Sequence, residues 1–159
     1  MKICPSKWTS VHQTMCMGNS PVTGNVEAGL VRQAVAALND GDIEGYLSGF
    51  APDCLRWVGG LGLALTVPDI RENLGQLFAA FDELHLDEDL LFGGDGHVCA
   101  RWTLRGVHTG AYGGIAPTGR EIAVDTCEVY TFTGDKVTEC HVYGETMSLF
   151  NQLSGSVDE

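Results

Sequence analysis

The segment LRGVHTGAYGGIAPTGREIAV spans Leu104–Val124 and sets the fold of the second half of the chain. It joins two strand-like runs, and the first of these runs ends at His108. Five glycines and one proline, Pro117, lie within the segment. Glycine permits positive φ and close backbone approach, whereas proline fixes φ. The composition therefore predicts a loop of defined shape that holds His108 at its edge.

Strand-like runs continue on both sides of this loop, and helical patterns come before them. We expect strands at 54–58, 84–92, 97–108, 121–132 and 136–149, with glycine-containing turns at 93–96 and 133–135. Apolar residues at helical spacing predict three helices. The first is capped by Asn25, the second by Asp42, and the third opens at Thr66 with Pro68 in its first turn.

This order of elements is typical of an α+β fold with a mainly antiparallel sheet. Long twisted strands curl, so we expect a cone-shaped sheet around the three N-terminal helices, with a pocket between them. A chain of 159 residues fits one domain. We place this domain at 25–153, after a flexible N-terminal arm (1–24) and before a C-terminal tail (154–159).

The acidic composition excludes several classes of partner. The formal net charge is −12 and the pI is about 4.6. Nucleic acids and anionic membranes attract clustered Lys and Arg, so neither is an expected partner. No apolar run approaches the length of a membrane span, and the N-terminus lacks the apolar segment of a secretory signal. We therefore expect a cytoplasmic location.

The six cysteines show neither a CxxC motif nor a Cys/His cluster. Cys99, Cys127 and Cys140 lie in apolar strand-like runs, where a thiol behaves as a small hydrophobic group. We interpret the cysteines as reduced and structural, and we expect no metal site. The acidic residues at 82–89 are interpreted as a solvated strand edge that discourages strand pairing.

Four short motifs carry a family resemblance. They are Arg101-Trp102, Gly106-Val107-His108-Thr109-Gly110, Gly114-Ile115-Ala116-Pro117-Thr118-Gly119-Arg120 and the terminal Gln152-Leu153. From about residue 26 to residue 153, the chain resembles the SnoaL-like polyketide cyclases of the cone-shaped NTF2-like superfamily. The resemblance implies a cofactor-independent enzyme that closes rings by intramolecular aldol condensation. Relatives with this cone include ketosteroid isomerase, limonene-type epoxide hydrolases and non-catalytic proteins.

The last expected strand carries the first candidate site. His141, Tyr143 and Glu145 alternate, so they share one face of the sheet. The resemblance places the family's acid/base aspartate at Glu145 and its usual tryptophan at His141. We expect this face to line the pocket because ionisable residues in clefts are functional candidates. A solvated face of an edge strand is the alternative.

Other candidates lie on neighbouring strands. Glu128 occupies the place of the protonated aspartate of ketosteroid isomerase, and desolvation beside apolar neighbours would raise the pKa of such a carboxyl. Alternatively, Glu128 would only pair with Arg101 or His141 across the sheet. His108 is a further candidate for binding a carbonyl or moving a proton. We expect substrate contacts from Tyr143, Trp57, Arg101 and Tyr130, and core positions for Tyr46, Trp102 and Phe78.

These residues predict acid/base chemistry on a hydrophobic, oxygenated small molecule. Glu145, helped by His141, would remove a proton next to a carbonyl, and His108, Tyr143 or protonated Glu128 would stabilise the enolate. The enolate would then attack a second carbonyl held close by the pocket. Opening of an epoxide or closure of an ether ring stays an alternative, as does non-catalytic binding. The broad outer face of the sheet predicts a homodimer.

Overall fold

The computed structural model describes residues 26–59, 62–144 and 146–155. The expected arm (1–24) and residues 156–159 of the tail lie outside the described residues. The helices are α1 (Val26–Asn39), α2 (Ile43–Leu47), α3 (Val67–Ala80) and α4 (Thr146–Ser154). The strands are β1 (Phe50–Val58), β2 (Leu63–Leu65), β3 (Phe81–Gly94), β4 (His97–His108), β5 (Glu121–Thr133) and β6 (Lys136–Gly144).

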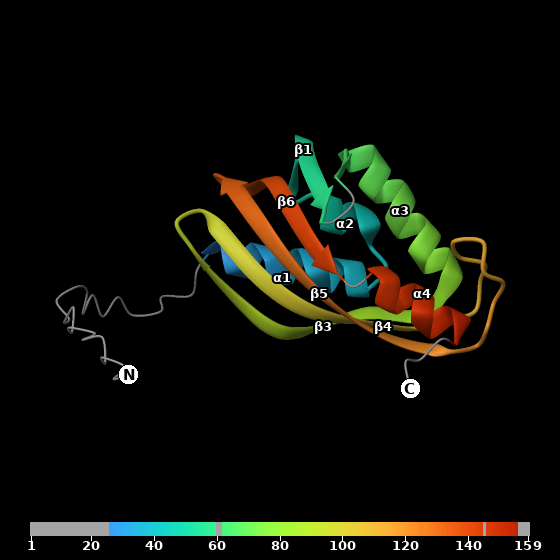
Figure 1. The fold of residues 1–159 in the computed structure, drawn as a ribbon. Coiled ribbons are helices and arrows are strands. Elements are labelled where there is room, and N and C mark those ends of the chain that lie inside the picture. The colour runs from blue at the N-terminus through green and yellow to red at the C-terminus, as the bar shows by residue number, and fades with distance from the viewer. Residues whose placement is uncertain (1–25, 60–61, 145, 156–159) are drawn as a thin grey trace, which may run out of the picture.

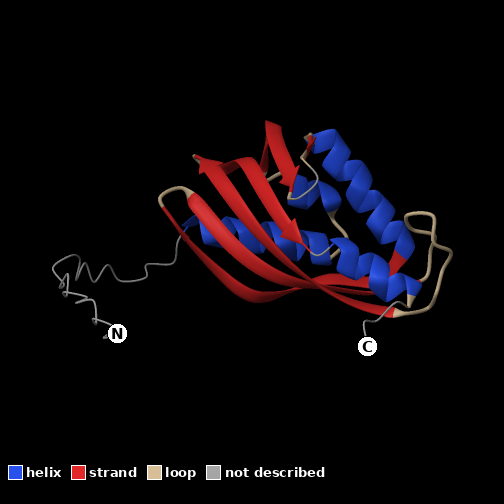
Figure 2. Cartoon of the chain, viewed as in Figure 1, coloured by secondary structure: helices blue, strands red, loops and turns tan. Residues whose placement is uncertain are grey.

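All six strands belong to one strongly curved sheet in the order β2-β1-β6-β5-β4-β3. Neighbouring strands are antiparallel except β1 and β6, which are parallel. Helices α1, α2 and α3 lie on the concave side of the sheet, and α4 follows β6 at one end (Figures 1 and 2). The α+β cone with a mainly antiparallel sheet is therefore confirmed.

Irregularities in the edge strand β3 explain part of the curvature. The register with β4 shifts between Asp82 and His85 and again between Glu88 and Leu90. Glu83, inside the first of these shifts, has a φ of 54°. Extra residues in one strand of a pair bend that strand and increase its local twist. Two such points in β3 turn the sheet around the helices.

Local sequence fixes where the third helix begins. The Asp69 carboxylate accepts hydrogen bonds from the Thr66 backbone N–H (2.8 Å) and hydroxyl (2.5 Å). These bonds lower the pKa of Asp69 and satisfy donors at the helix start. Pro68 lies in the first turn, where its missing N–H leaves no intrahelical bond unmade. Helix α3 then buries Ile70 and Leu74 against the sheet.

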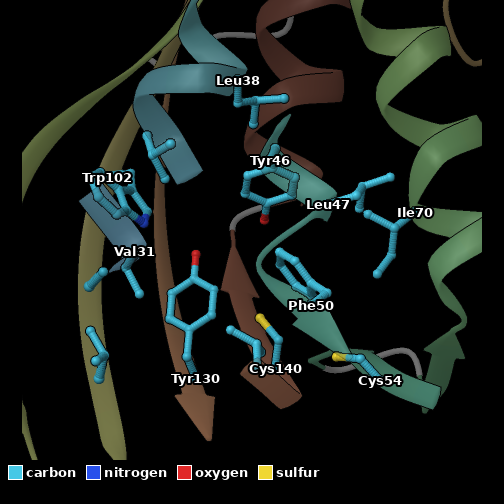
Figure 3. Close-up of a cluster of buried hydrophobic side chains, with 14 of the residues drawn as sticks. Val31, Leu38, Tyr46, Leu47, Phe50, Cys54, Ile70, Trp102, Tyr130 and Cys140 are labelled. Atoms are coloured by element: carbon cyan, nitrogen blue, oxygen red, sulfur yellow. The ribbon is translucent and has the colours of Figure 1, made fainter. Parts of the chain in front are cut away.

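The buried side chains form two clusters along the cone. The larger cluster lies between α1, α2 and α3 on one side and the sheet on the other (Figure 3). The smaller one lies at the other end, where α4 packs Leu149 and Leu153 against Ile122 and Val124 of β5. Two clusters at opposite ends leave the middle of the concave face for a cavity.

The prediction of one strand over 136–149 is wrong beyond residue 144, because α4 occupies 146–154. Leu149 and Leu153 are four residues apart, which puts both on one helical face and buries them. The Gln152 side chain supplies the hydrogen bonds that a neighbouring strand would give. It accepts from the N–H of Ala123 and donates to the carbonyl of Ala123, both at 2.9 Å.

The remaining expectations on chain organisation concern membrane spans and cysteines. No helix in the described part of the chain is long and apolar enough to cross a membrane. Within 26–59, 62–144 and 146–155, the four cysteines are free thiols, as predicted. They are Cys54, Cys99, Cys127 and Cys140. Cys4 and Cys16 lie outside the described residues.

Candidate functional site

The glycine-rich loop after β4 has the defined shape that its sequence predicts. Two backbone hydrogen bonds of 2.9 Å close it, from His108 N–H to the Arg120 carbonyl and from Gly119 N–H to the His108 carbonyl. A Cβ on Gly110 would lie 2.3 Å from the carbonyl oxygen of Ala79. Only glycine permits this contact between the loop and the end of α3.

His108 is fully buried at the base of this loop. Its Nδ1 accepts the Thr118 backbone N–H at 3.3 Å and lies 3.0 Å from the Thr118 hydroxyl. This network assigns the ring proton to Nε2, which has no partner among the described residues. The ring packs against Phe81, with centroids 5.1 Å apart. His108 does not line the main cavity described next.

The cavity between the helices and the concave face of the sheet is called the main cavity, although two other hollows have larger volumes. It holds about 570 Å³ of empty space, including its open mouth. Most of its wall is apolar, with Leu38, Leu74, Leu77, Phe78, Leu84, Leu86, Leu104 and Val142. The polar lining consists of Asn39, Tyr46, Arg56, His85, Thr126 and Glu128. A mostly apolar wall with few polar groups is typical of a small-molecule site.

An ion pair forms the polar centre of this cavity. Arg56 Nη2 lies 2.6 Å from Glu128 Oε1, and the exposed fractions of the two side chains are 16% and 7%. The Tyr130 hydroxyl donates to the other carboxylate oxygen, Glu128 Oε2. Both oxygens of Glu128 are thus acceptors. The hydroxyls of Tyr46 and Tyr130 point toward each other (Figure 3), and Tyr46 lines the same cavity as Arg56 and Glu128.

Burial and the ion pair set the charges of these groups. Desolvation raises the pKa of Tyr130 far above its usual value, and the nearby charge of Glu128 raises it further. Desolvation also raises the pKa of Tyr46, so both phenols stay protonated. Burial opposes the charge of Arg56, but the attraction of Glu128 together with its neighbours raises the pKa of Arg56 overall. The centre therefore combines one fixed cation, two phenol donors and one carboxylate.

Strand register brings the pair together from distant parts of the sequence. Arg56 in β1 is opposite Cys140 in β6, and Glu128 in β5 is opposite Val142 in β6. Cys140 is fully buried and Val142 lines the cavity. Side chains opposite each other share a face, so Arg56 and Glu128 both point into the cone.

The structure places His141 and Tyr143 on the opposite, outer face, which differs from the expected position in the pocket. His141 alternates with the inward-facing Cys140 and Val142, and its side chain is 39% exposed. A 2.9 Å contact joins His141 Nε2 to Glu139. The alternative interpretation, a solvated face, fits these two residues.

A β-bulge in β6 explains why the alternation of residues along this strand predicts the wrong face for His141. Val137 and Cys140 are both buried although they are three residues apart, so they cannot share a face of a regular strand. The register between β5 and β6 shifts at Thr131 and Phe132. Counting in twos from Val137 therefore reaches His141, on the outer face, instead of Cys140.

The remaining candidate residues also lie on different faces of the sheet. Trp57 lies on the outer face and stacks on His141, with ring centroids 6.3 Å apart. Arg101 is also on the outer face, 58% exposed and 3.6 Å from Asp89, so it does not pair with Glu128. Glu145 lies outside the described residues. Glu128 and Tyr130 are the two candidates that the structure brings together, but with Arg56 as the partner.

Sequence reasoning missed Arg56, and it placed Tyr46 and Phe78 in the core although both also line the cavity. One signal for Arg56 exists: it is the single charged residue of the apolar run Cys54–Val58 and lies two positions from the buried Cys54. In the described part of the chain, His, Cys, Asp and Glu form no group of three or more that would hold a metal ion.

Comparison with known proteins defines the class. AclR of Streptomyces galilaeus, a candidate hydroxylase, is 23% identical over 84% of this chain and 83% of its own, with a TM-score of 0.77. IdmH of Streptomyces antibioticus, a candidate polyketide cyclase, is 18% identical over 82% and 99%, with a TM-score of 0.73. A protein of Catenulispora acidiphila with a ketosteroid isomerase-like fold is 20% identical over 79% of this chain and 92% of its own, with a TM-score of 0.65. No curated protein matches the sequence.

These likenesses establish the fold class of NTF2-like and ketosteroid isomerase-like cones. The family follows from the sequence itself, because the model of the SnoaL-like polyketide cyclases matches residues 28–153. The chain therefore belongs to the SnoaL-like polyketide cyclase family.

Proposed function

We propose that this protein is a cyclase that closes a ring within a hydrophobic, oxygenated small molecule by acid/base chemistry of the aldol type. Glu128 is the proposed acid/base residue, and Arg56 is its partner at the floor of the cavity. The observation that carries the proposal is a carboxylate, 5% exposed, on the wall of an otherwise apolar cavity. Buried ionisable residues that line a cavity are functional candidates.

The proposed reaction starts with enolisation. Glu128 takes a proton from the carbon next to a carbonyl, and the electron pair moves onto the carbonyl oxygen. Arg56 supplies positive charge beside the developing oxyanion, where low polarity strengthens the interaction. The enolate carbon attacks a second carbonyl of the same molecule and forms a C–C bond. The proton held by Glu128 then passes to the new alkoxide, so no atom is gained or lost.

The surroundings of Glu128 support this role. The Tyr130 hydroxyl fixes one carboxylate oxygen and Arg56 fixes the other, so the group is held in one orientation. Leucine side chains and Phe78 make up most of the remaining wall, so the surroundings of the ion pair are largely apolar. Burial of a charged pair adds little to stability compared with apolar residues of the same volume. The presence of such a pair inside a cavity favours a chemical role.

Hydrogen exchange at a carbon centre tests the enolisation step. Bicyclic and tricyclic aryl ketones, starting with 1-tetralone, are incubated in D₂O, and deuterium at the carbon next to the carbonyl is followed by NMR. We expect the protein to accelerate exchange and Glu128→Gln to lower that acceleration about 100-fold, the lower range for a general base. Glu139→Gln, on the outer face, is the matched control and should keep the full rate.

Glu145→Gln decides between the two carboxylates that the sequence offers. Loss of exchange in Glu145→Gln with full activity in Glu128→Gln would transfer the base to Glu145 and overturn the role proposed for Glu128. Ketone binding without any exchange, in both the native protein and the variants, would instead favour the non-catalytic alternative. Turnover of an epoxide with no exchange into ketones would favour the ring-opening alternative.

We also propose that the outer face of the sheet forms the interface of a homodimer. Trp57, His141 and Tyr143 stack in a row there, and Tyr143 is 56% exposed. Exposed aromatic rows commonly mark interaction surfaces. Light scattering should give twice the mass of one chain, and Tyr143→Lys should shift the protein toward the monomer. A monomer at every concentration would contradict this assignment.

A further inference from the structure

Two cysteines lie side by side on the outer face of the sheet. Cys99 in β4 and Cys127 in β5 have sulfurs 3.8 Å apart, and both residues are half-buried. They are 28 positions apart in the sequence, so no local motif predicts the pair. The other two described cysteines, Cys54 and Cys140, are buried in the core. Of the described cysteines, Cys99 and Cys127 are therefore the two that solvent reaches.

Strand register argues against a disulfide within this thiol pair. Cys99 is opposite Val129 and Cys127 is opposite Arg101, so the two cysteines are diagonal neighbours. Diagonal positions on paired strands are about 7–8 Å apart, whereas the Cα atoms of a disulfide are about 4.4–6.8 Å apart. A disulfide would also bring the sulfurs to about 2.05 Å, which requires the strands to move. The pair instead leaves room for one bridging atom.

The distance between the sulfurs suits a single soft ion. An ion bonded to both sulfurs at about 2.3 Å, the length of a zinc–thiolate bond, bridges sulfurs up to about 4.6 Å apart. The observed 3.8 Å therefore needs no movement of the strands. In the described ranges, His, Cys, Asp and Glu form no group of three or more that would complete a zinc site. The geometry thus favours an ion that accepts two thiolates, and thiolate ligands select Cu(I).

Arg101 supplies a positive charge beside the thiol pair. Two thiolates and one monovalent cation carry a net negative charge. Arg101 is directly opposite Cys127 on the same face, and Asp89 lies 3.6 Å from its Nε, beyond hydrogen-bond distance. A guanidinium in this place favours the thiolate form and would balance the negative complex. A hollow of about 680 Å³, counted with its open mouth, is lined by both Arg101 and Cys127 and gives access from solvent.

We propose that Cys99 and Cys127 form a binding site for a soft monovalent metal ion, Cu(I), on the outer face of the sheet. Each bound ion displaces the two thiol protons to solvent, and two sulfur–metal bonds replace the contact between the thiols. Desolvation and the neighbouring Cys127 raise the pKa of Cys99, so this thiol holds its proton at neutral pH until a cation displaces it. The site is on the other side of the sheet from the Glu128 cavity and does not depend on the proposed function.

Competition with the Cu(I) chelator bicinchoninate, followed by absorbance in the absence of oxygen, tests the site. The starting protein is the full chain with Cys4→Ser and Cys16→Ser, which removes the two thiols outside the described residues. We expect one bound Cu(I) per chain. Cys99→Ala or Cys127→Ala should each lower the affinity more than about 100-fold, beyond the usual loss of an outer partner.

Matched controls separate the site from general effects. Cys54→Ala removes a buried thiol and should leave the affinity within about twofold of the starting value. Arg101→Met should lower the affinity about fivefold, as expected for one screened charge, whereas Arg105→Met, four residues further along β4, should not. Circular dichroism checks that each variant is folded. Because Tyr143 is directly opposite Cys127 and belongs to the proposed dimer interface, each titration is repeated with Tyr143→Lys.

Two results would overturn the site. One is an unchanged affinity in both Cys99→Ala and Cys127→Ala, and the other is an absence of bound Cu(I) both with and without Tyr143→Lys. Neither result bears on enolisation at Glu128. Full deuterium exchange in Glu128→Gln would in turn overturn the proposed function and leave the thiol site intact.

Discussion

The two faces of the sheet carry similar ion pairs in opposite surroundings. On the concave face, Arg56 and Glu128 are 2.6 Å apart and at most 16% exposed. On the outer face, Arg105 and Asp87 are 2.8 Å apart and about half exposed. Water screens the outer pair and stabilises each of its charges separately, whereas the inner charges depend on each other. The distance between partners is therefore a poor guide to the role of a pair, and burial is a better one.

Loss of one partner of the buried ion pair should have the largest effect on the free energy of unfolding. Arg56→Met leaves the Glu128 carboxylate buried without its cation, so the free energy of unfolding should fall by about 3–5 kcal/mol. Arg105→Met on the outer face should lower it by less than about 1 kcal/mol. Chemical denaturation measures both. Replacing the whole inner pair, Arg56→Met with Glu128→Leu, should recover most of the loss, and equal losses in the two single variants would contradict the comparison.

Thiol reactivity should differ between the faces by one to two orders of magnitude. Desolvation raises the pKa of the inner Cys54 to about 11, against a usual value of 9.0. At pH 8 this lowers its reactive thiolate fraction about 100-fold. Cys99 and Cys127 are half-buried on the outer face, with their sulfurs 3.8 Å apart. Desolvation raises the pKa of Cys99 as well, but its exposure admits reagents.

N-ethylmaleimide labelling followed by peptide mass spectrometry measures this difference. Cys99 and Cys127 should react at least about tenfold faster than Cys54 and Cys140 in the native protein. Labelling in denaturant, where all thiols are exposed, is the control. Equal native rates would show that the concave face opens to reagents far more readily than its burial implies.

Alkaline pH should destabilise the protein through the inner tyrosines. Desolvation raises the pKa of Tyr46 and Tyr130 in the folded state, so unfolded tyrosine loses its proton first, at about pH 10. Below pH 10 each tyrosine contributes its full stabilisation. Above pH 10 the contribution of each tyrosine to the free energy of unfolding falls by up to about 1.4 kcal/mol per pH unit. Denaturation at pH 9–11 should show this slope reduced in Tyr130→Phe. An unchanged slope would argue against a buried phenol.

The smallest effect should come from the outer pair of Glu139 and His141. Glu139 is 45% exposed and His141 39%, so solvent already stabilises both side chains. Glu139→Gln should change the free energy of unfolding by no more than about 0.5 kcal/mol. Chemical denaturation at pH 7 gives the value. The measurement uses the monomeric Tyr143→Lys background, because the proposed dimer would cover this face, and a loss above about 2 kcal/mol in that background would contradict the exposure of the pair.

The sequence predicted the elements well where short-range signals were strong. The strand His97–His108 has the predicted bounds, and the capping signals at Thr66 and Asp42 mark the starts of two helices. Alternation failed in β6 because a bulge lies between Val137 and Cys140, and nothing in the local pattern marks it. The strand prediction also ran into α4, whose Gln152 satisfies the edge of β5 through a side chain.

In the candidate site, too, some residues had a signal in the local sequence and others had none. The sequence offered Glu128 as a candidate because the resemblance places it at the aspartate of ketosteroid isomerase and its neighbours are apolar, and it offered Tyr130 as a substrate contact. Arg56 was missed because its importance depends on the parallel pairing of β1 with β6, strands more than 70 residues apart. Long-range pairing of this kind has no local signature.

By itself, the sequence determined the fold class, the loop at 109–120 and the family, because helix caps, strand periods and glycine positions are local properties of the chain. The tertiary structure alone decided which polar residues share a cavity. Strand pairing and bulges choose the face on which each side chain emerges, and a shift of one residue moves it from the solvent to the interior. That choice placed Arg56, Glu128 and Trp102 on the inside and His141 on the outside.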